Sequence, residues 1–151
     1  MDDKIQITPW ICLAMMRLGT RMATEFDHRF EKSGITQAQF RILLTIWDKG
    51  GSGGIAPSIL ADHLMIERGT VSVLTSRMVD RGWLSRQPGQ NRRTYQLILT
   101  EAGSQLLQEV RPKAIGLAEH TLSGIPLAEL LQMRASLERI ETRLREYTPP
   151  E

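Results

Sequence analysis

The stretch APSILADHLMIERGTVSVLTSRMVDRGWLSRQPGQNRRTYQLILTE, residues 56–101, decides the fold of this chain. Apolar residues spaced three and four apart predict a short helix that begins at Pro57 and a second helix over residues 68–81, which a glycine ends. Two β-rich segments, 84–86 and 94–99, flank a turn that contains Pro and Gly. The stretch therefore predicts two helices joined by a turn and followed by a β-hairpin.

Positive charge is concentrated in the same stretch. Residues 68–93 contain six arginines and one acid, a local charge of +5, whereas the whole chain carries only +2. The six are Arg68, Arg77, Arg81, Arg86, Arg92 and Arg93. Charge gathered on a helix and a hairpin tip is the pattern that a phosphate backbone selects, so we expect double-stranded DNA as a partner.

Composition narrows the class of protein further. A chain of 151 residues with 41% hydrophobic residues is expected to form one domain, 1–151, with its own core. The single cysteine excludes an intramolecular disulfide framework and a Cys-cluster zinc site. No apolar run is long enough to cross a bilayer and the first residues lack the order of a signal peptide, so we expect a cytoplasmic protein without a membrane partner.

An enzyme is not indicated by the sequence. The three histidines, His28, His63 and His120, are far apart, and neither a metal-ligand spacing nor a nucleophile–base motif is visible. We expect no metal and no cofactor. Catalytic residues that converge only in space remain an alternative, as does a protein-interaction module whose main interface is formed by the terminal helices.

A long N-terminal helix is predicted over residues 8–32, with Thr8 as its N-cap and Pro9 in its first turn. It carries two adjoining apolar ridges, one of which includes Ile11. The next helix begins after Thr36, has Phe40, Leu43, Leu44 and Trp47 on one face, and ends at Gly50. The GGSGG run that follows is rich in glycine and is therefore expected to be a flexible loop. It is not expected to bind phosphate, because the Lys and Ser/Thr of a phosphate-binding loop are missing.

Residues 104–147 predict further helices, with a kink or break near Arg111 because Pro112 follows it. The last of them has an a/d heptad pattern. Its apolar positions are Leu130, Met133, Leu137, Ile140, Leu144 and Tyr147. We expect a dimerisation region formed by residues 8–32 and 104–147, around a lobe of residues 36–103; an ordinary core helix is the alternative for the heptad pattern.

Three motifs resemble the MarR family of winged helix-turn-helix regulators: LADHL at 60–64, TVSVLTSRMVDRGWLSR at 70–86 and NRRTYQLILTEAG at 91–103. The resemblance implies a mainly α fold with a small β-wing, in which the winged helix-turn-helix lobe is joined to a helical dimerisation region. It also implies a homodimer, expected to be a repressor, that binds a pseudo-palindromic operator. Recognition helices would enter successive major grooves, and wing arginines would enter minor grooves.

Transferred residue by residue, the resemblance gives the candidate DNA contacts. Those for the major groove are Arg68, Thr70, Ser72, Val73, Ser76 and Arg77, and those for the wing are Arg86, Arg92 and Arg93. Arg86 is expected to position the protein on phosphate, and Arg77 has the alternative of an ion pair with Asp80 or Asp62. The chain departs from the family pattern at Asn91, where an acid is usual, at Val73, where Arg is frequent, and at Glu67, where a Ser-like cap is common.

The family resemblance also implies a small aromatic effector, bound between the dimerisation helices and the lobe. The candidates for this pocket are Trp10, Met15, Met16, Arg17, Phe40 and Trp47, with core packing as the alternative for the apolar ones. Cys12 lies where peroxide-sensing members carry a reactive thiol, which makes a redox sensor the second hypothesis. Such sensors use tyrosines near the thiol, and the tyrosines here are Tyr95, expected in the wing, and Tyr147.

Overall fold

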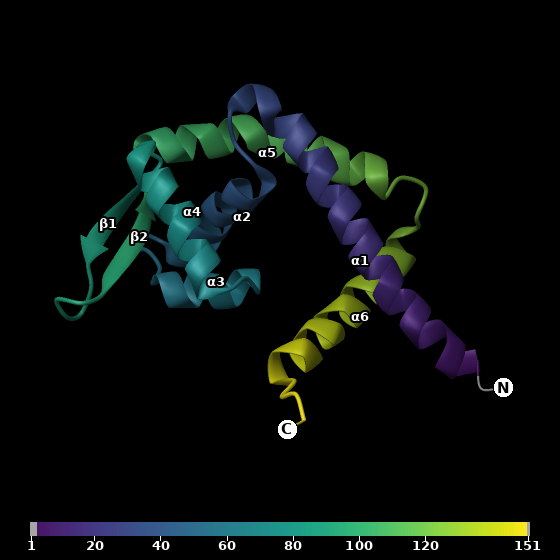
Figure 1. Ribbon diagram of the computed structural model, residues 1–151. Helices are drawn as coiled ribbons and strands as arrows, with labels where there is room; N and C mark the ends of the chain where they lie inside the picture. Colours follow the sequence, from purple (N-terminus) through teal and green to yellow (C-terminus); the bar gives the residue numbers. More distant parts are fainter. Residues whose placement is uncertain (1–2, 151) are drawn as a thin grey trace. The chain divides into compact units, whose positions relative to one another are not determined.

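The computed structural model describes residues 3–150, and the chain divides into two compact units after residue 117 (Figure 1). The first unit contains helices α1 to α4, the β-hairpin and most of α5, and the second contains the end of α5 and helix α6. The elements are mainly helical, with a single antiparallel pair of strands, as the sequence predicted.

Helix α1 spans Asp3–Phe30 and begins before its predicted N-cap. Thr8 lies inside the helix, where its Oγ1 donates a 2.7 Å hydrogen bond to the Lys4 carbonyl, so the prediction of Thr8 as N-cap is wrong. The reason is that a Thr hydroxyl bonds an i−4 carbonyl as readily as it caps a helix. A 3₁₀ turn, η1 (Glu31–Ser33), follows, and Gly34 ends it at φ 70°, the left-handed region that favours glycine.

Helix α2 (Gln37–Thr45) begins with a capping box in which the side chains of Thr36 and Gln39 each accept the other's backbone N–H. Phe40 and Leu43 are buried as predicted. The helix continues as a wider π-turn, η2 (Ile46–Gly50), which shifts the periodicity, so Ile46 is buried and Trp47 is half exposed. Trp47 was wrongly predicted on the buried face.

The GGSGG run is held at its end by pairing with the hairpin. Ile55 forms an antiparallel bridge with Leu97, with backbone hydrogen bonds of 3.0 and 2.8 Å in the two directions. Gly54 has φ 79°, and a Cβ at this position would lie 2.6 Å from the Leu97 carbonyl oxygen. Gly54 therefore requires glycine, because its approach to the strand leaves no space for a side chain.

Helices α3 (Pro57–Leu64) and α4 (Arg68–Asp80) form the predicted helix-turn-helix. The turn contains Met65 in the left-handed conformation, at φ 54°. The two helices pack with α2 and the hairpin around one apolar core. Its most buried large residues are Phe30, Ile42, Leu43, Ile46, Leu60, Val71, Met78, Leu84, Leu97, Leu107 and Val110.

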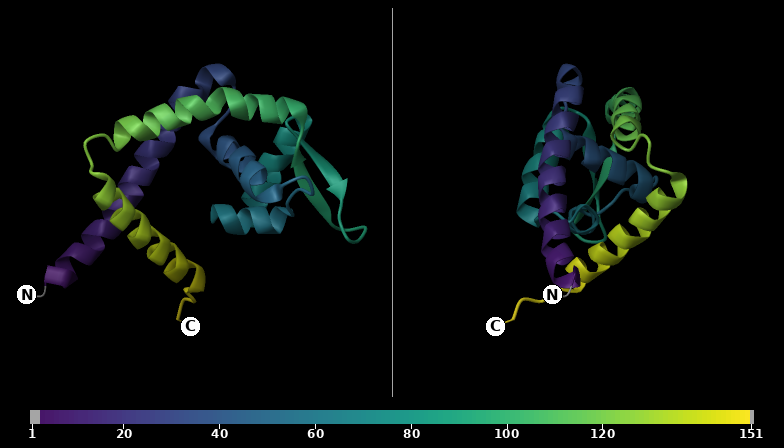
Figure 2. Two further views of the ribbon diagram at one scale, coloured as in Figure 1. Left: turned by 180° about the vertical axis from the view of Figure 1, so that it is seen from behind. Right: turned by 90° about the vertical axis from the view of Figure 1, so that its right-hand side faces the viewer.

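The hairpin consists of β1 (Leu84–Pro88) and β2 (Tyr95–Leu99), paired from Leu84 with Leu99 to Pro88 with Tyr95. Leu84 and Leu97 enter the core and fix the base of the hairpin. Its tip extends beyond the helices of the first unit, as Figure 2 shows from behind. This is the wing of the predicted fold.

Helix α5 (Glu101–Thr121) begins directly after Thr100, whose Oγ1 accepts a 3.0 Å hydrogen bond from Gly103 N. The helix continues through Pro112, so the predicted break does not occur. Buried residues on both sides of the proline, Leu107 and Val110 before it and Ala114 after it, explain the continuity, because their packing offsets the lost backbone hydrogen bond.

A polar cluster ties α5 to η1. Ser33 Oγ donates a 2.7 Å hydrogen bond to Glu109 Oε1, and Lys113 Nζ donates to Ser33 Oγ at 2.6 Å. Lys113 Nζ also lies 3.5 Å from Glu109 Oε1. The hydrogen bond from Ser33, with the nearby charge of Lys113, holds the pKa of Glu109 below its ordinary value.

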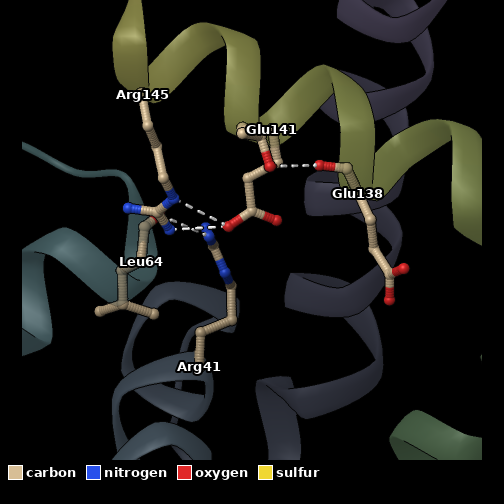
Figure 3. Close-up of polar contacts among 6 residues, drawn as sticks. Arg41, Leu64, Glu138, Glu141 and Arg145 are labelled. Carbon is tan, nitrogen blue, oxygen red and sulfur yellow. Dashed lines mark hydrogen bonds and ion pairs between the residues drawn. The ribbon is translucent and has the colours of Figure 1, made fainter.

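In the second unit, α6 (Leu127–Glu146) carries an i,i+4 ion pair in which Arg145 Nη2 lies 2.7 Å from Glu141 Oε1 (Figure 3). Four positions of its heptad pattern, Met133, Leu137, Leu144 and Tyr147, are exposed, and Leu130 and Ile140 are half-buried. Within residues 3–150 no helix is long and apolar enough to cross a membrane.

Candidate nucleic-acid interface

Helix α4 has one fully buried face and one outward face. Val71, Thr75 and Met78 are fully buried, at the spacing of one helical face. The neighbouring Leu74 is only half-buried. Burial of the Thr75 hydroxyl is tolerated because its Oγ1 donates a 2.8 Å hydrogen bond to the Val71 carbonyl. The helix is thereby held rigidly against the core, with its other side toward solvent.

The candidate major-groove residues lie on that outward side. Arg68, Thr70, Ser72, Val73 and Arg77 are exposed, and Ser76 is half-buried. Among the described residues no ion pair joins Arg77 to Asp80, and an ion pair of Arg77 with Asp62 stays a prediction. The outward side of α4 is therefore polar and basic at both ends.

The tip of the wing is closed by the side chain and backbone of Asn91. Asn91 Oδ1 accepts a 2.9 Å hydrogen bond from Arg93 N, and the Asn91 carbonyl accepts one from Thr94 N at 3.2 Å. A neutral amide thus performs the turn-closing role open to an acid, without negative charge. Arg92 and Arg93 are exposed on this turn.

Arg86 joins the wing to α4. Its Nη2 donates a 3.0 Å hydrogen bond to Ser76 Oγ, and its guanidinium lies 5.3 Å from the centre of the Tyr95 ring. Two residues expected to contact DNA, Ser76 and Arg86, are therefore bonded to each other. The outward side of α4 and the wing form one continuous surface through this contact.

Arg81 serves the fold of the lobe. Its Nη1 donates a 3.1 Å hydrogen bond to the Gly34 carbonyl, and its guanidinium lies 5.0 Å from the centre of the Trp83 ring. All six clustered arginines are exposed, and the side chains of Arg81 and Arg86 are also engaged by neighbouring elements. The other four lie at the ends of α4's outward side and on the wing tip.

Gly69, in the first turn of α4, was not among the DNA contacts that the sequence predicted. A Cβ on Gly69 would meet nothing within 4 Å, and its φ is not positive, so neither packing nor backbone conformation within the chain requires glycine here. The sequence signal that could have identified it is a glycine inside a predicted helix. Such a glycine lowers helix stability by about 1 kcal/mol relative to alanine, so its presence indicates a role outside the folded chain.

The six effector candidates do not gather in one place within the chain. Trp10, Met16 and Arg17 are exposed on α1, and Met15 is half-buried there. Trp47 lies against Arg111, whose guanidinium is 4.6 Å from the centre of its ring. The candidates on α1 fall on several sides of that helix, and Trp47 lies in the π-turn that follows the helix of Phe40, so the predicted pocket stays a prediction.

A hollow of about 350 Å³ lies between α1 and α2 and includes one candidate, Phe40. Its lining residues are Gly19, Met22, Ala23, Phe26, Gln37, Phe40 and Arg41. Arg41 Nη2 donates a 3.1 Å hydrogen bond to the Leu64 carbonyl (Figure 3), so this guanidinium also touches the end of α3. The hollow combines an apolar wall with one cation.

The part of the chain that the structure describes bears on the metal-ligand and redox hypotheses. No group of three or more His, Cys, Asp or Glu residues in this part could hold a metal ion. Cys12 is exposed on α1, and Tyr95 lies in the wing, where the sequence predicted it.

The helix-turn-helix, the outward side of α4 and the attached hairpin define the chain as a winged helix-turn-helix protein. Residues 35–95 match the sequence model of the MarR family. This is the family that the three motifs of the chain resemble, and the match lies within its winged helix-turn-helix part.

Two curated relatives resemble the chain over most of its length. The transcriptional regulator PecS of Dickeya dadantii is 28% identical over 142 residues, which cover 93% of this chain and 86% of PecS. The transcriptional repressor MprA of Escherichia coli K12 is 25% identical over 130 residues, 85% of this chain and 73% of MprA.

Solved structures have the same fold. A MarR regulator from Methanosarcina mazei has a TM-score of 0.79 at 26% identity and covers 93% of both chains. A mutant of Escherichia coli MarR in complex with operator DNA has a TM-score of 0.76 at 21% identity, covering 93% of this chain and 99% of that one. CouR from Rhodococcus jostii, bound to p-coumaroyl-CoA, has a TM-score of 0.77 at 18% identity and covers 87% and 91%.

Proposed function

We propose that this protein is a homodimeric, sequence-specific DNA-binding transcriptional regulator, and that it acts as a repressor. The observation that carries the proposal is the continuous surface from α4 to the wing, joined by the Arg86–Ser76 hydrogen bond and carrying exposed arginines at its ends. The names of PecS and MprA and the operator complex of MarR support it.

In this proposal α4 is the recognition helix. Arg68 and Arg77 supply charge for phosphates or guanine edges, and Thr70 and Ser72 supply short hydroxyls that do not prevent entry into a major groove. Arg92 and Arg93 enter the neighbouring minor groove, where a narrow groove concentrates negative potential. Arg86 acts as a positioning residue, because its bond to Ser76 sets the wing relative to α4.

We propose that a second copy of the chain covers the exposed apolar side chains of the terminal helices. Contiguous exposed apolar residues mark interaction surfaces in proteins that remain in solution. The proposed dimer contacts are Ile11, Leu130, Met133, Leu137, Ile140 and Leu144. Two lobes related by a two-fold axis would then match a pseudo-palindromic operator.

For the effector we propose a small aromatic acid in the hollow between α1 and α2. Phe26, Phe40 and Met22 offer the apolar wall, and Arg41 offers a partner for a carboxylate. The p-coumaroyl-CoA ligand of CouR supports an aromatic effector, and the carboxylate is inferred from Arg41 alone. Binding would act through different affinities for two arrangements of the dimer, which change the separation of the recognition helices.

The two other hypotheses lead to different experiments. If peroxide abolishes DNA binding by the unsubstituted protein but not by Cys12→Ser, a redox sensor is favoured. If peroxide abolishes DNA binding by both proteins, Cys12 is excluded as the cause. A protein-interaction module would bind its partner with little dependence on salt, because apolar contacts release few counterions.

The experiment that tests the proposed function is selection of bound duplexes from a random DNA pool, followed by titration of the enriched duplex across salt. We expect a pseudo-palindrome with half-sites about one helical turn apart, and an affinity that falls steeply as salt rises. The same titration with the double variant Arg92→Ala/Arg93→Ala should give a lower affinity and a weaker dependence of the affinity on salt. Absence of any enriched duplex would contradict the proposal.

A further inference from the structure

Val73 occupies the centre of the outward side of α4. It lies two residues from Val71 and two from Thr75, both fully buried, and two helical residues correspond to a rotation of about 200°. Its side chain is therefore directed away from the core, and it is 54% exposed. It is the one large apolar residue of α4 that is exposed.

Neither packing nor helix propensity explains a valine at this position. An exposed side chain contributes little burial to the folded lobe, and a β-branched residue is a weaker helix former than alanine or arginine. The residues around it on the same side, Gly69, Thr70, Ser76 and Arg77, are small or polar. The apolar side chain thus interrupts a surface that is otherwise suited to hydrogen bonding.

The chemistry of the major groove supplies a specific match for such a side chain. Valine neither donates nor accepts a hydrogen bond, so it gains nothing from the polar edges of guanine, cytosine or adenine. Thymine presents a C5-methyl group in the major groove, the apolar feature that distinguishes it there. We propose that Val73 is a specificity-determining residue that packs against the C5-methyl of one thymine in each operator half-site, an inference that rests on the proposed DNA-binding function.

The test uses the duplex enriched from the random pool, with deoxyuridine replacing thymidine at one position at a time. This replacement removes the methyl group and keeps the base pair. At one position in each half-site we expect the affinity to fall about fourfold, the factor that corresponds to one buried methyl group. Deoxyuridine placed outside the half-sites is the control and should change nothing.

The assignment to Val73 comes from repeating the scan with Val73→Ala, because alanine is a better helix former and keeps α4 intact. In this variant the thymidine and deoxyuridine duplexes should bind equally well at the sensitive position. Val73→Thr, which keeps the branched shape and one methyl group, should restore part of the difference.

The outcomes separate the inference from the proposed function. Equal binding of the two duplexes at every position by the unsubstituted protein would overturn the inference, and so would an unchanged fourfold difference in Val73→Ala. Either result leaves sequence-specific binding intact. Failure of any duplex to bind would instead overturn the proposed function together with the inference.

Discussion

The lobe of residues 36–103 differs from the terminal helices α1 and α6 in the burial of its large apolar side chains. In the lobe, Leu43, Leu60 and Met78 are fully buried in one core. In α1 and α6 most large apolar residues are exposed, among them Leu18 at 60% and Leu137 at 49%. The same residue types thus have different environments in the two regions.

The difference indicates what each region requires from outside the chain. The helices and wing of the lobe pack on one core, which Phe30 of α1 and Leu107 and Val110 of α5 complete, and the outward side of α4 and the wing tip carry exposed arginines. The terminal helices leave apolar area exposed to water, and covering this area with another surface would lower the free energy. We infer that the lobe supplies the proposed DNA contact and that the terminal helices supply the proposed dimer contact.

The largest expected effect is that of a cavity in the lobe. Leu43→Ala removes a fully buried side chain and should lower the free energy of unfolding by about 2–5 kcal/mol. Denaturation monitored by circular dichroism measures this loss. A loss below 1 kcal/mol would contradict the contrast between the lobe and the terminal helices, because the stability of the lobe would then not depend on its core.

The matched change in the terminal helices is Leu137→Asp. The side chain is half exposed in the chain, so the helix content should persist, whereas self-association should weaken by roughly 1.5–3 kcal/mol, the value of burying one leucine. Sedimentation across protein concentrations measures the monomer fraction. Unchanged association would remove Leu137 from the proposed dimer contact.

On the surface of the lobe, Arg93→Ala should weaken operator binding by roughly 1–3 kcal/mol and leave the free energy of unfolding unchanged, because the side chain is exposed on the wing tip. Arg29→Ala, an equal loss of charge on α1, is the control. Fluorescence anisotropy with the selected duplex measures both variants. Equal affinities for Arg93→Ala and the unsubstituted protein would exclude the minor-groove role.

Gly69→Ala separates stability from binding at a single position. The added Cβ has free space, and alanine is the better helix former, so the free energy of unfolding should rise by about 0.5–1 kcal/mol. Operator affinity should fall, because the methyl group holds the first turn of α4 away from the bases. Raised stability with unchanged affinity would show that DNA does not approach Gly69 closely.

The smallest effect concerns the contact between η1 and α5. The lowered pKa of Glu109 means that the folded state favours its carboxylate, so this group stabilises the fold above its unfolded pKa, and the contribution is lost as pH falls through the folded pKa. Ser33→Ala removes the main cause and should raise the pKa of Glu109 toward its ordinary value. Carboxyl NMR titration measures this shift, and an unmoved pKa would assign the lowering to Lys113.

Much of the lobe was predictable because its signals are local. The capping residue Thr36, the turn glycine at Gly34 and the order of helices and strands follow from spacing and from residue types with strong backbone preferences. The outward residues of α4 followed from helical periodicity in the same way. The corrections fall at the start of α1, at the π-turn before Gly50 and at Pro112, where packing or an irregular turn overrides the local rule.

The sequence alone determined that this chain forms a winged helix-turn-helix lobe with basic residues on the second helix and the wing, because periodicity, turn residues and charge are readable one segment at a time. Only the tertiary structure decided that Arg86 is bonded to Ser76 and that Ile55 pairs with Leu97. It also decided that Gly69 has open space around it. These facts depend on how distant segments approach each other, which is a property of the whole core and not of any one segment.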